Sequence, residues 1–294
     1  MTYPGATVYP SAATYPGSGS DTSATPLVAY TDFAPVPRVL VSLSPAAGGT
    51  QTVNVLRTSE GREMQVRGGV GVYAVGGVAV MDYEVPPGVS TYRFEQFDVN
   101  GVSLGFQTLG SITLPDFTCI HQPLSPALTV QSPRIMMDSA NDLARPSPGQ
   151  VVWPEGATVG RIIGGQRRGL TGTRLHVRLA SRAEAVTFAA MFGGYGQDFP
   201  SVLCIRTPVG KLPQLPRVLF AGCLDPHEVI SGADALLTYD MTVDEVAPPY
   251  PGLLLPLLRR DDLDAAYATR DEMDAAYATR LEEDTDFSLA GLAG

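Results

Sequence analysis

Residues 77–109, GVAVMDYEVPPGVSTYRFEQFDVNGVSLGFQTL, hold three short apolar segments separated by two turn signals. The segments span 78–83, 92–99 and 103–109, and the separators are Pro86-Pro87-Gly88 and Asn100-Gly101. Proline interrupts a strand ladder, and Asn-Gly is a strong signal for a two-residue hairpin turn. The stretch therefore predicts three β-strands joined by tight turns.

The residues before this stretch follow the same pattern. Val39–Leu43 is an apolar strand segment, residues 50–57 alternate in polarity, and residues 59–62 have the composition of a hairpin turn. Six or seven strands with a turn every 8–12 residues or so are typical of an immunoglobulin or fibronectin-III type sandwich. We therefore predict such a sandwich over 36–117, although without the Cys-Trp-Cys pattern of antibody domains.

A second β-rich domain is predicted over 118–248, where prolines separate short strands such as Leu175–Leu179. One helix is expected near 182–192, because Ser181 and Glu184 have capping-box spacing and Gly193 provides a stop. The predicted fold class is thus all-β. It comprises two β-sandwich-like domains, the second with one short helix, plus an extended N-terminal arm and a short helical C-terminal tail.

The composition limits the possible functions. Of 294 residues 44% are hydrophobic, so a core can form, and the formal charge of −10 argues against a nucleic-acid-coating protein. No apolar run is long enough to cross a membrane, so no membrane-spanning segment is expected. Lys211 is the only lysine beside 19 arginines, a bias typical of a GC-rich genome.

The N-terminal residues 1–35 form a low-complexity segment in which Tyr-Pro recurs with a spacing of six, at Tyr3, Tyr9 and Tyr15. Proline disfavours helix at and before its own position, so this segment should be extended. Two interpretations remain open. The segment is either a flexible leader or an arm that lies on a neighbouring subunit, with each tyrosine as an anchor.

The C-terminal residues 249–294 combine a Pro-rich linker with a repeat, DDLDAAYATR at 261–270 and DEMDAAYATR at 271–280. Thr269 with Glu272, and Thr279 with Glu282, have capping-box spacing, which predicts either one continuous helix or short helices restarting at each threonine. The tail is strongly acidic. It is either a solvated helix or a self-association element whose candidate contacts are Leu263, Tyr267, Met273 and Tyr277.

A cationic cluster lies within residues 161–182, which contain no acidic residue. Its candidate anion-docking residues are Arg161, Arg167, Arg168, Arg174 and Arg178, with Arg182 beside them. They are either a solvated sheet face or a patch for an acidic partner. Such a partner could be residues 259–286 of a neighbouring copy or an anionic cell-wall polymer.

Sequence signatures of catalysis are absent. No nucleophile elbow, Walker A loop, zinc-protease motif or dinucleotide fingerprint occurs, and the glycines at 164–169 indicate a turn rather than a phosphate loop. His121, His176 and His227 are far apart, and residues 225–228 indicate a turn. Cys119, Cys204 and Cys223 lack zinc or disulfide-scaffold spacing. We therefore expect no catalytic residues, no metal and no cofactor, and a protein that is not an enzyme.

The leader YPGATVYPSAATYPG, the two β-modules and the repeat DLDAAYATRDEMDAAYATR together resemble minor tail proteins of tailed bacteriophages that infect actinobacteria. The arginine bias agrees with this resemblance. It implies a structural virion protein of the tail tip or baseplate, made in the host cytoplasm. Such a protein would assemble as a homo-oligomer, with a trimer as our expectation, contact other tail proteins and support host attachment, including contact with a host cell-surface polymer.

The alternative is a cell-wall or carbohydrate-binding module without catalysis. Trp153 and Tyr195 are the first candidates for stacking against a sugar in that case.

Overall fold

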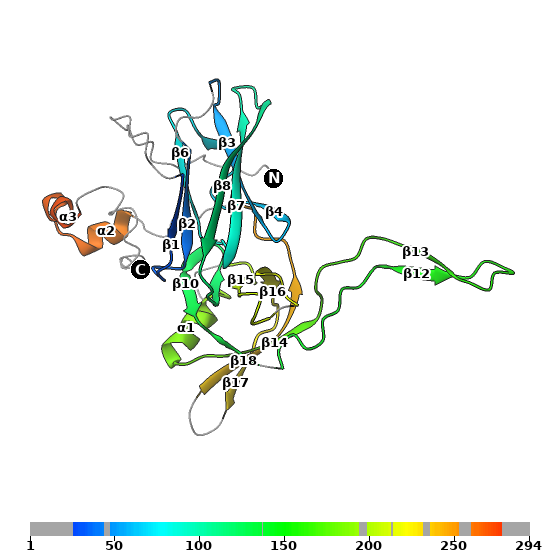
Figure 1. Ribbon diagram of the computed structural model, residues 1–294. Helices are drawn as coiled ribbons and strands as arrows, with labels where there is room; N and C mark the ends of the chain where they lie inside the picture. Colours follow the sequence, from blue (N-terminus) through cyan, green and yellow to red (C-terminus); the bar gives the residue numbers. More distant parts are fainter. Residues whose placement is uncertain are drawn as a thin grey trace, which may run out of the picture.

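The computed structural model describes residues 26–43, 48–136, 138–193, 199–212, 214–231, 236–252 and 260–277 (Figure 1). Nearly all regular structure in these residues is antiparallel β-strand, and the helices are three short ones. The predicted all-β class is therefore confirmed.

The first unit is a β-sandwich. Its strands are β1 (Leu27–Tyr30), β2 (Arg38–Leu43), β3 (Thr52–Ser59), β4 (Arg62–Gln65), β5 (Val72–Tyr73), β6 (Val78–Asp82), β7 (Gly88–Phe97) and β8 (Ser103–Leu114). One sheet has the order β1-β2-β6, and the other has the order β4-β3-β7-β8 with β5 beside β3. The sandwich thus includes residues 27–30, which were predicted to belong to the N-terminal arm.

Alternation along the strands builds the core of the sandwich. In β7 every second residue is buried, so Tyr92 and Phe94 point inward while Arg93 and Glu95 lie on the outer face. Val39 and Val41 of β2 face them from the other sheet and are fully buried. This strict period of two is the pattern expected of a sheet with one buried face.

The second unit is built around one eight-stranded sheet. Its order is β10-β9-β15-β16-β18-β14-β11, and β17 also pairs with β18. The strands are β9 (Cys119–Gln122), β10 (Ser125–Gln131), β11 (Arg134–Ile135), β14 (Thr173–Arg178), β15 (Val202–Arg206), β16 (Val218–Gly222), β17 (His227–Ser231) and β18 (Leu236–Glu245). Helix α1 (Arg182–Ala190) packs Phe188 against Tyr239 of β18, and both side chains are buried.

Buried arginine side chains join the two units. Arg206 of β15 is fully buried and donates to the carbonyl oxygens of Pro37 and Val85 at 2.8 and 2.9 Å. Arg67 of the sandwich donates to the carbonyl oxygens of Pro249 and Tyr250, both at 3.0 Å. These contacts tie β15 and the segment that follows β18 to the sandwich.

A two-stranded arm leaves the second unit. It consists of β12 (Gly149–Val152) and β13 (Arg161–Gly164), which among the described strands pair only with each other (Figure 1). Near its base the amide of Arg168 donates to the carbonyl of Pro146 at 2.9 Å, and Ala144 bridges Thr171. At about 3.3 Å per residue, the segment from Ala144 to Trp153 reaches roughly 30 Å.

The acidic repeat forms two short helices, α2 (Arg260–Ala266) and α3 (Arg270–Ala276). Thr269 caps α3 with a complete capping box, in which its hydroxyl accepts from the Glu272 amide and the Glu272 carboxylate accepts from the Thr269 amide. Over these residues the helix therefore restarts at the threonine rather than continuing. The second predicted cap, Thr279 with Glu282, lies outside the described residues.

Helix α1 begins at the predicted cap, but its reciprocal bond differs from a standard capping box. The Ser181 hydroxyl accepts from the Glu184 amide at 3.2 Å, whereas the Glu184 carboxylate accepts from the Ala180 amide at 2.7 Å.

Ser181→Ala should lower the free energy of unfolding by about 1 kcal/mol, because one helix donor loses its acceptor. Urea unfolding monitored by circular dichroism measures this loss. An unchanged midpoint would show that water replaces the cap.

Within the part of the chain that the structure describes, no helix is long and apolar enough to cross a membrane.

Candidate interaction site

The arm presents apolar side chains without any covering layer. Val151 and Ile162 are register partners on one face, and Trp153 follows Val151 on that face. Trp153 is 63% exposed and Ile162 is 82% exposed. Each such side chain gains about 2 kcal/mol when it is moved out of water. An isolated two-stranded hairpin is marginally stable, so a partner that covers this face would stabilise the arm.

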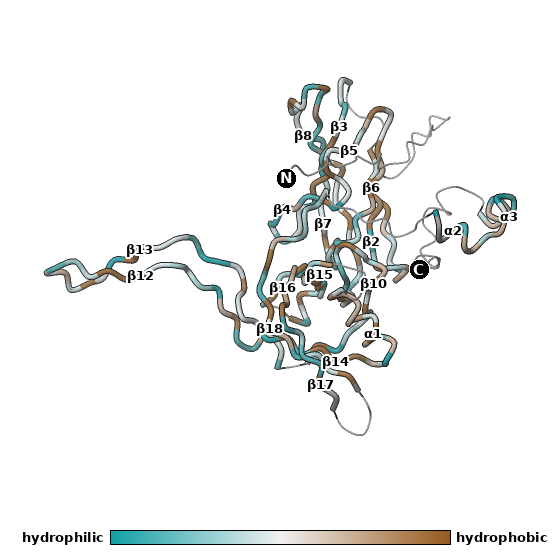
Figure 2. Tube along the Cα trace, turned by 180° about the vertical axis from the view of Figure 1, so that it is seen from behind, coloured by the Kyte–Doolittle hydropathy of each residue, from teal (hydrophilic) through white to brown (hydrophobic). Residues whose placement is uncertain are grey.

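Gly160 shapes the apolar face. A Cβ atom added to it would lie 2.5 Å from Cγ1 of Val151 and 3.0 Å from Cε2 of Trp153. The indole therefore rests directly over the backbone of the opposite strand. This contact fixes the ring as a flat, accessible surface beside Val151 and Ile162, and Figure 2 shows the hydrophobic segments along the arm.

The arm is also cationic in an acidic protein. Residues 145–168 contain four arginines and one acid, Glu155, for a net charge of +3, whereas the whole chain carries −10. The remainder of the chain therefore carries −13. A cationic apolar arm on an acidic body is electrostatically suited to contact another acidic body.

The structure divides the predicted cationic cluster between the arm and the body. Arg161 lies on β13, and Arg167 and Arg168 lie at the base of the arm. Arg174 and Arg178 lie on β14 of the main sheet. Arg174 is held by Asp240 through two hydrogen bonds of 2.7 and 2.9 Å, and this carboxylate raises the pKa of the guanidinium.

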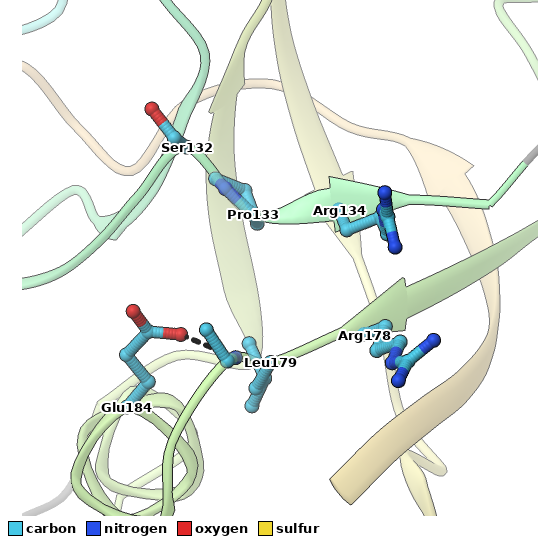
Figure 3. A pocket seen from close by; sticks show the side chains of 7 residues that line it. Ser132, Pro133, Arg134, Arg178, Leu179 and Glu184 are labelled. Carbon is cyan, nitrogen blue, oxygen red and sulfur yellow. Dashed lines mark hydrogen bonds between the residues drawn. The ribbon is translucent and has the colours of Figure 1, made fainter. Parts of the chain in front are cut away.

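Arg178 borders a shallow hollow of about 290 Å³ (Figure 3). Its register partner Arg134 lies beside it, and no acidic side chain among the described residues pairs with either. On the other side of the hollow, the Glu184 carboxylate accepts from the Ala180 amide. The two guanidinium groups could contact a small anion, although Glu184 lowers the positive potential nearby.

Two of the four candidate contacts in the tail meet each other. The hydroxyls of Tyr267 and Tyr277 are 3.0 Å apart, and their rings form an edge-to-face pair with centroids 5.8 Å apart. Leu263 is buried, whereas Met273 is half-buried. Part of the predicted apolar stripe thus packs within the chain. Tyr3, Tyr9, Tyr15 and Tyr195 lie outside the described residues.

The histidines occupy three different settings. His176 lies between the carboxylates of Asp138 and Asp240, at 2.8 and 3.3 Å. The nearby Ser139 hydroxyl bonds to the backbone of His176 rather than to its ring, so it is not arranged as an activated nucleophile. His227 pairs with Asp225 on the surface, and His121 is fully buried. No group of three metal-ligating side chains occurs among the described residues.

Comparison with known proteins gave no further guide to function. No protein-family model matches the chain, and no significantly similar curated protein was found.

From the sequence, Trp153 was predicted only as a sugar-stacking candidate, and neither Val151 nor Ile162 was predicted to take part in a site. The signal available was the pair of apolar segments GQVVW and GRIIGG. Such segments have the same composition as buried strands, so their exposure emerges only from the structure.

Proposed function

We propose that this protein is a structural component of a bacteriophage tail tip or baseplate, which assembles as a homo-oligomer and supports host attachment. The single observation that carries this proposal is the projecting arm with its uncovered apolar face. Subunits of a ring need a surface that reaches a neighbour, and an arm of roughly 30 Å serves that purpose. The resemblance of the two chain ends to minor tail proteins supports the same function.

The rigid junction between the two units supports the proposal further. Arg206 and Arg67 bind backbone carbonyls across the junction, so the sandwich and the arm-bearing sheet keep a fixed relation. Because the two units keep fixed positions, the arm of one subunit can contact one neighbouring subunit while a distant surface of the same subunit contacts another. Within a ring, each weak contact is reinforced by the others through a raised effective concentration.

One observation favours a second candidate function, a non-catalytic cell-wall or carbohydrate-binding module. Trp153 is exposed, as an indole that stacks on sugar rings must be. However, its neighbours on that face are Val151, Gly160 and Ile162, which supply no hydrogen-bonding side chain. Sugar sites need polar partners for the hydroxyl groups, so the arm is better suited to a protein surface.

Light scattering on the full chain and on a variant with residues 150–163 replaced by a short Gly-Ser turn tests the proposal. We expect the full chain to have the mass of several subunits and the variant to have the mass of one. Closed rings in negative-stain electron micrographs would agree. A monomeric full chain that is retained on isolated actinobacterial cell walls, with retention lost in Trp153→Ala, would instead support the binding module.

A further inference from the structure

We propose that the apolar face of the arm docks on the outer face of β7 and β8 of a second copy of this chain. This inference rests on the proposed function, because it names the surface through which the subunits would assemble. It adds a specific receptor site, which neither the sequence nor the resemblance assigns.

The outer face of β8 is the complementary apolar surface on the body. Leu104 and Phe106 are about half exposed, and Val99 and Val102 in the preceding turn are more exposed still. Phe106 lies under the guanidinium of Arg93, which is 4.1 Å from the ring centroid, so this contact restrains the ring. Like the face of the arm, this surface has one aromatic ring flanked by aliphatic side chains.

The charges of the two surfaces are opposite. Glu95 is the register partner of Phe106, and Arg93, the nearby cation, is paired with Glu63 at 2.7 Å; Asp98 lies in the turn between β7 and β8. The carboxylate of Asp98 accepts from the amides of Asn100 and Val102, both at 2.8 Å, which keeps its pKa below the usual range. The turn and strands around Phe106 therefore present negative charge to a partner, while the arm together with its base, residues 145–168, carries a net charge of +3.

The contact must form between copies rather than within one chain. The arm leaves the second unit and extends away from the body, with its tip far from β8 (Figure 1). The arm and the β8 face are different surfaces, so each copy would give one contact and receive another. Such a head-to-tail interface generates a ring when the rotation closes.

Complementation between two variants tests this inference. The arm variant carries Val151→Ser with Ile162→Ser, and the receptor variant carries Leu104→Ser with Phe106→Ser. A matched control carries Val186→Ser with Leu224→Ser, two exposed apolar side chains on other surfaces. We expect each of the first two variants to be monomeric alone, the control to assemble like the original chain, and an equal mixture of the two variants to form a complex of two chains.

The mixture distinguishes this inference from the proposed function. A complex of two chains would show that both variants fold, since each must supply one intact surface. If the receptor variant assembles normally while the arm variant does not, the β8 receptor site is wrong but arm-driven assembly stands. If both variants and their mixture stay monomeric, the β8 site is also wrong. If the original chain is itself monomeric, both proposals fail.

Discussion

Asp82→Ala should lower the free energy of unfolding by about 3–5 kcal/mol, because it leaves a buried guanidinium without its partner. Asp82 accepts two hydrogen bonds from Nη1 of Arg57, at 2.6 and 2.8 Å. It also accepts from the Tyr92 hydroxyl at 2.8 Å and from the Glu84 amide at 2.9 Å. Asp82 and Arg57 are at most 2% exposed, and they connect β6 of one sheet with β3 of the other.

An exposed ion pair on the same sandwich provides the control for Asp82. Glu63 and Arg93 are 2.7 Å apart but remain more than one third exposed. Glu63→Ala should therefore cost at most about 1 kcal/mol. Urea unfolding of both variants measures the difference. Equal losses would contradict the view that burial makes the Asp82 network important.

The double variant Arg57→Met with Asp82→Leu should recover much of the stability that Asp82→Ala loses, since it leaves no unpaired charge buried at these two positions.

His121→Leu should remove a large part of the acid sensitivity of the fold. His121 is fully buried, and neither ring nitrogen has a hydrogen-bond partner among the described residues. Burial, and then the guanidinium groups of Arg206 and Arg67, lower the pKa of His121 well below its ordinary value. The folded protein therefore holds His121 neutral at pH values where the unfolded chain binds a proton.

The sign of the pH effect follows from this difference in protonation. Above about pH 6.5 both states are neutral at this position, so His121 contributes no pH dependence. Below about pH 6.5 unfolding takes up a proton, and stability should fall by up to about 1.4 kcal/mol per pH unit until the folded pKa is reached. Denaturant unfolding of both proteins from pH 7.5 to 4.5 gives the difference. Parallel curves for the original chain and His121→Leu would contradict the prediction.

The sandwich was predictable because its strands alternate strictly and are separated by Pro-Pro-Gly and Asn-Gly. Strand β1 was not predicted, since residues 27–30 follow a low-complexity segment and acquire their role by pairing with β2. Helix α1 was predictable from Ser181, because a cap is a local signal. Burial of Arg57 and Arg206 was not predictable, because their partners lie 25 and more than 100 residues away.

The interaction site was predictable only in part. The sequence predicts one cationic cluster that contains Arg161, Arg167 and Arg168 together with Arg174. In the structure the first three lie on the arm or at its base, whereas the charge of Arg174 is balanced by Asp240. The apolar face was not predicted, because Val151 and Ile162 occur in segments that also suit a buried strand. The exposure of Val151, Trp153 and Ile162 in the structure is what shows that this face is uncovered.

The most direct test of arm-driven assembly uses Trp153, the only tryptophan in the chain. Its fluorescence and the light-scattering mass should be measured together across a dilution series. If the arm mediates assembly, the emission maximum will move to shorter wavelength and acrylamide quenching will decrease as the mass rises, because the exposed indole becomes covered. Emission that stays at the long wavelength of an exposed indole while the mass rises would contradict assembly through the arm.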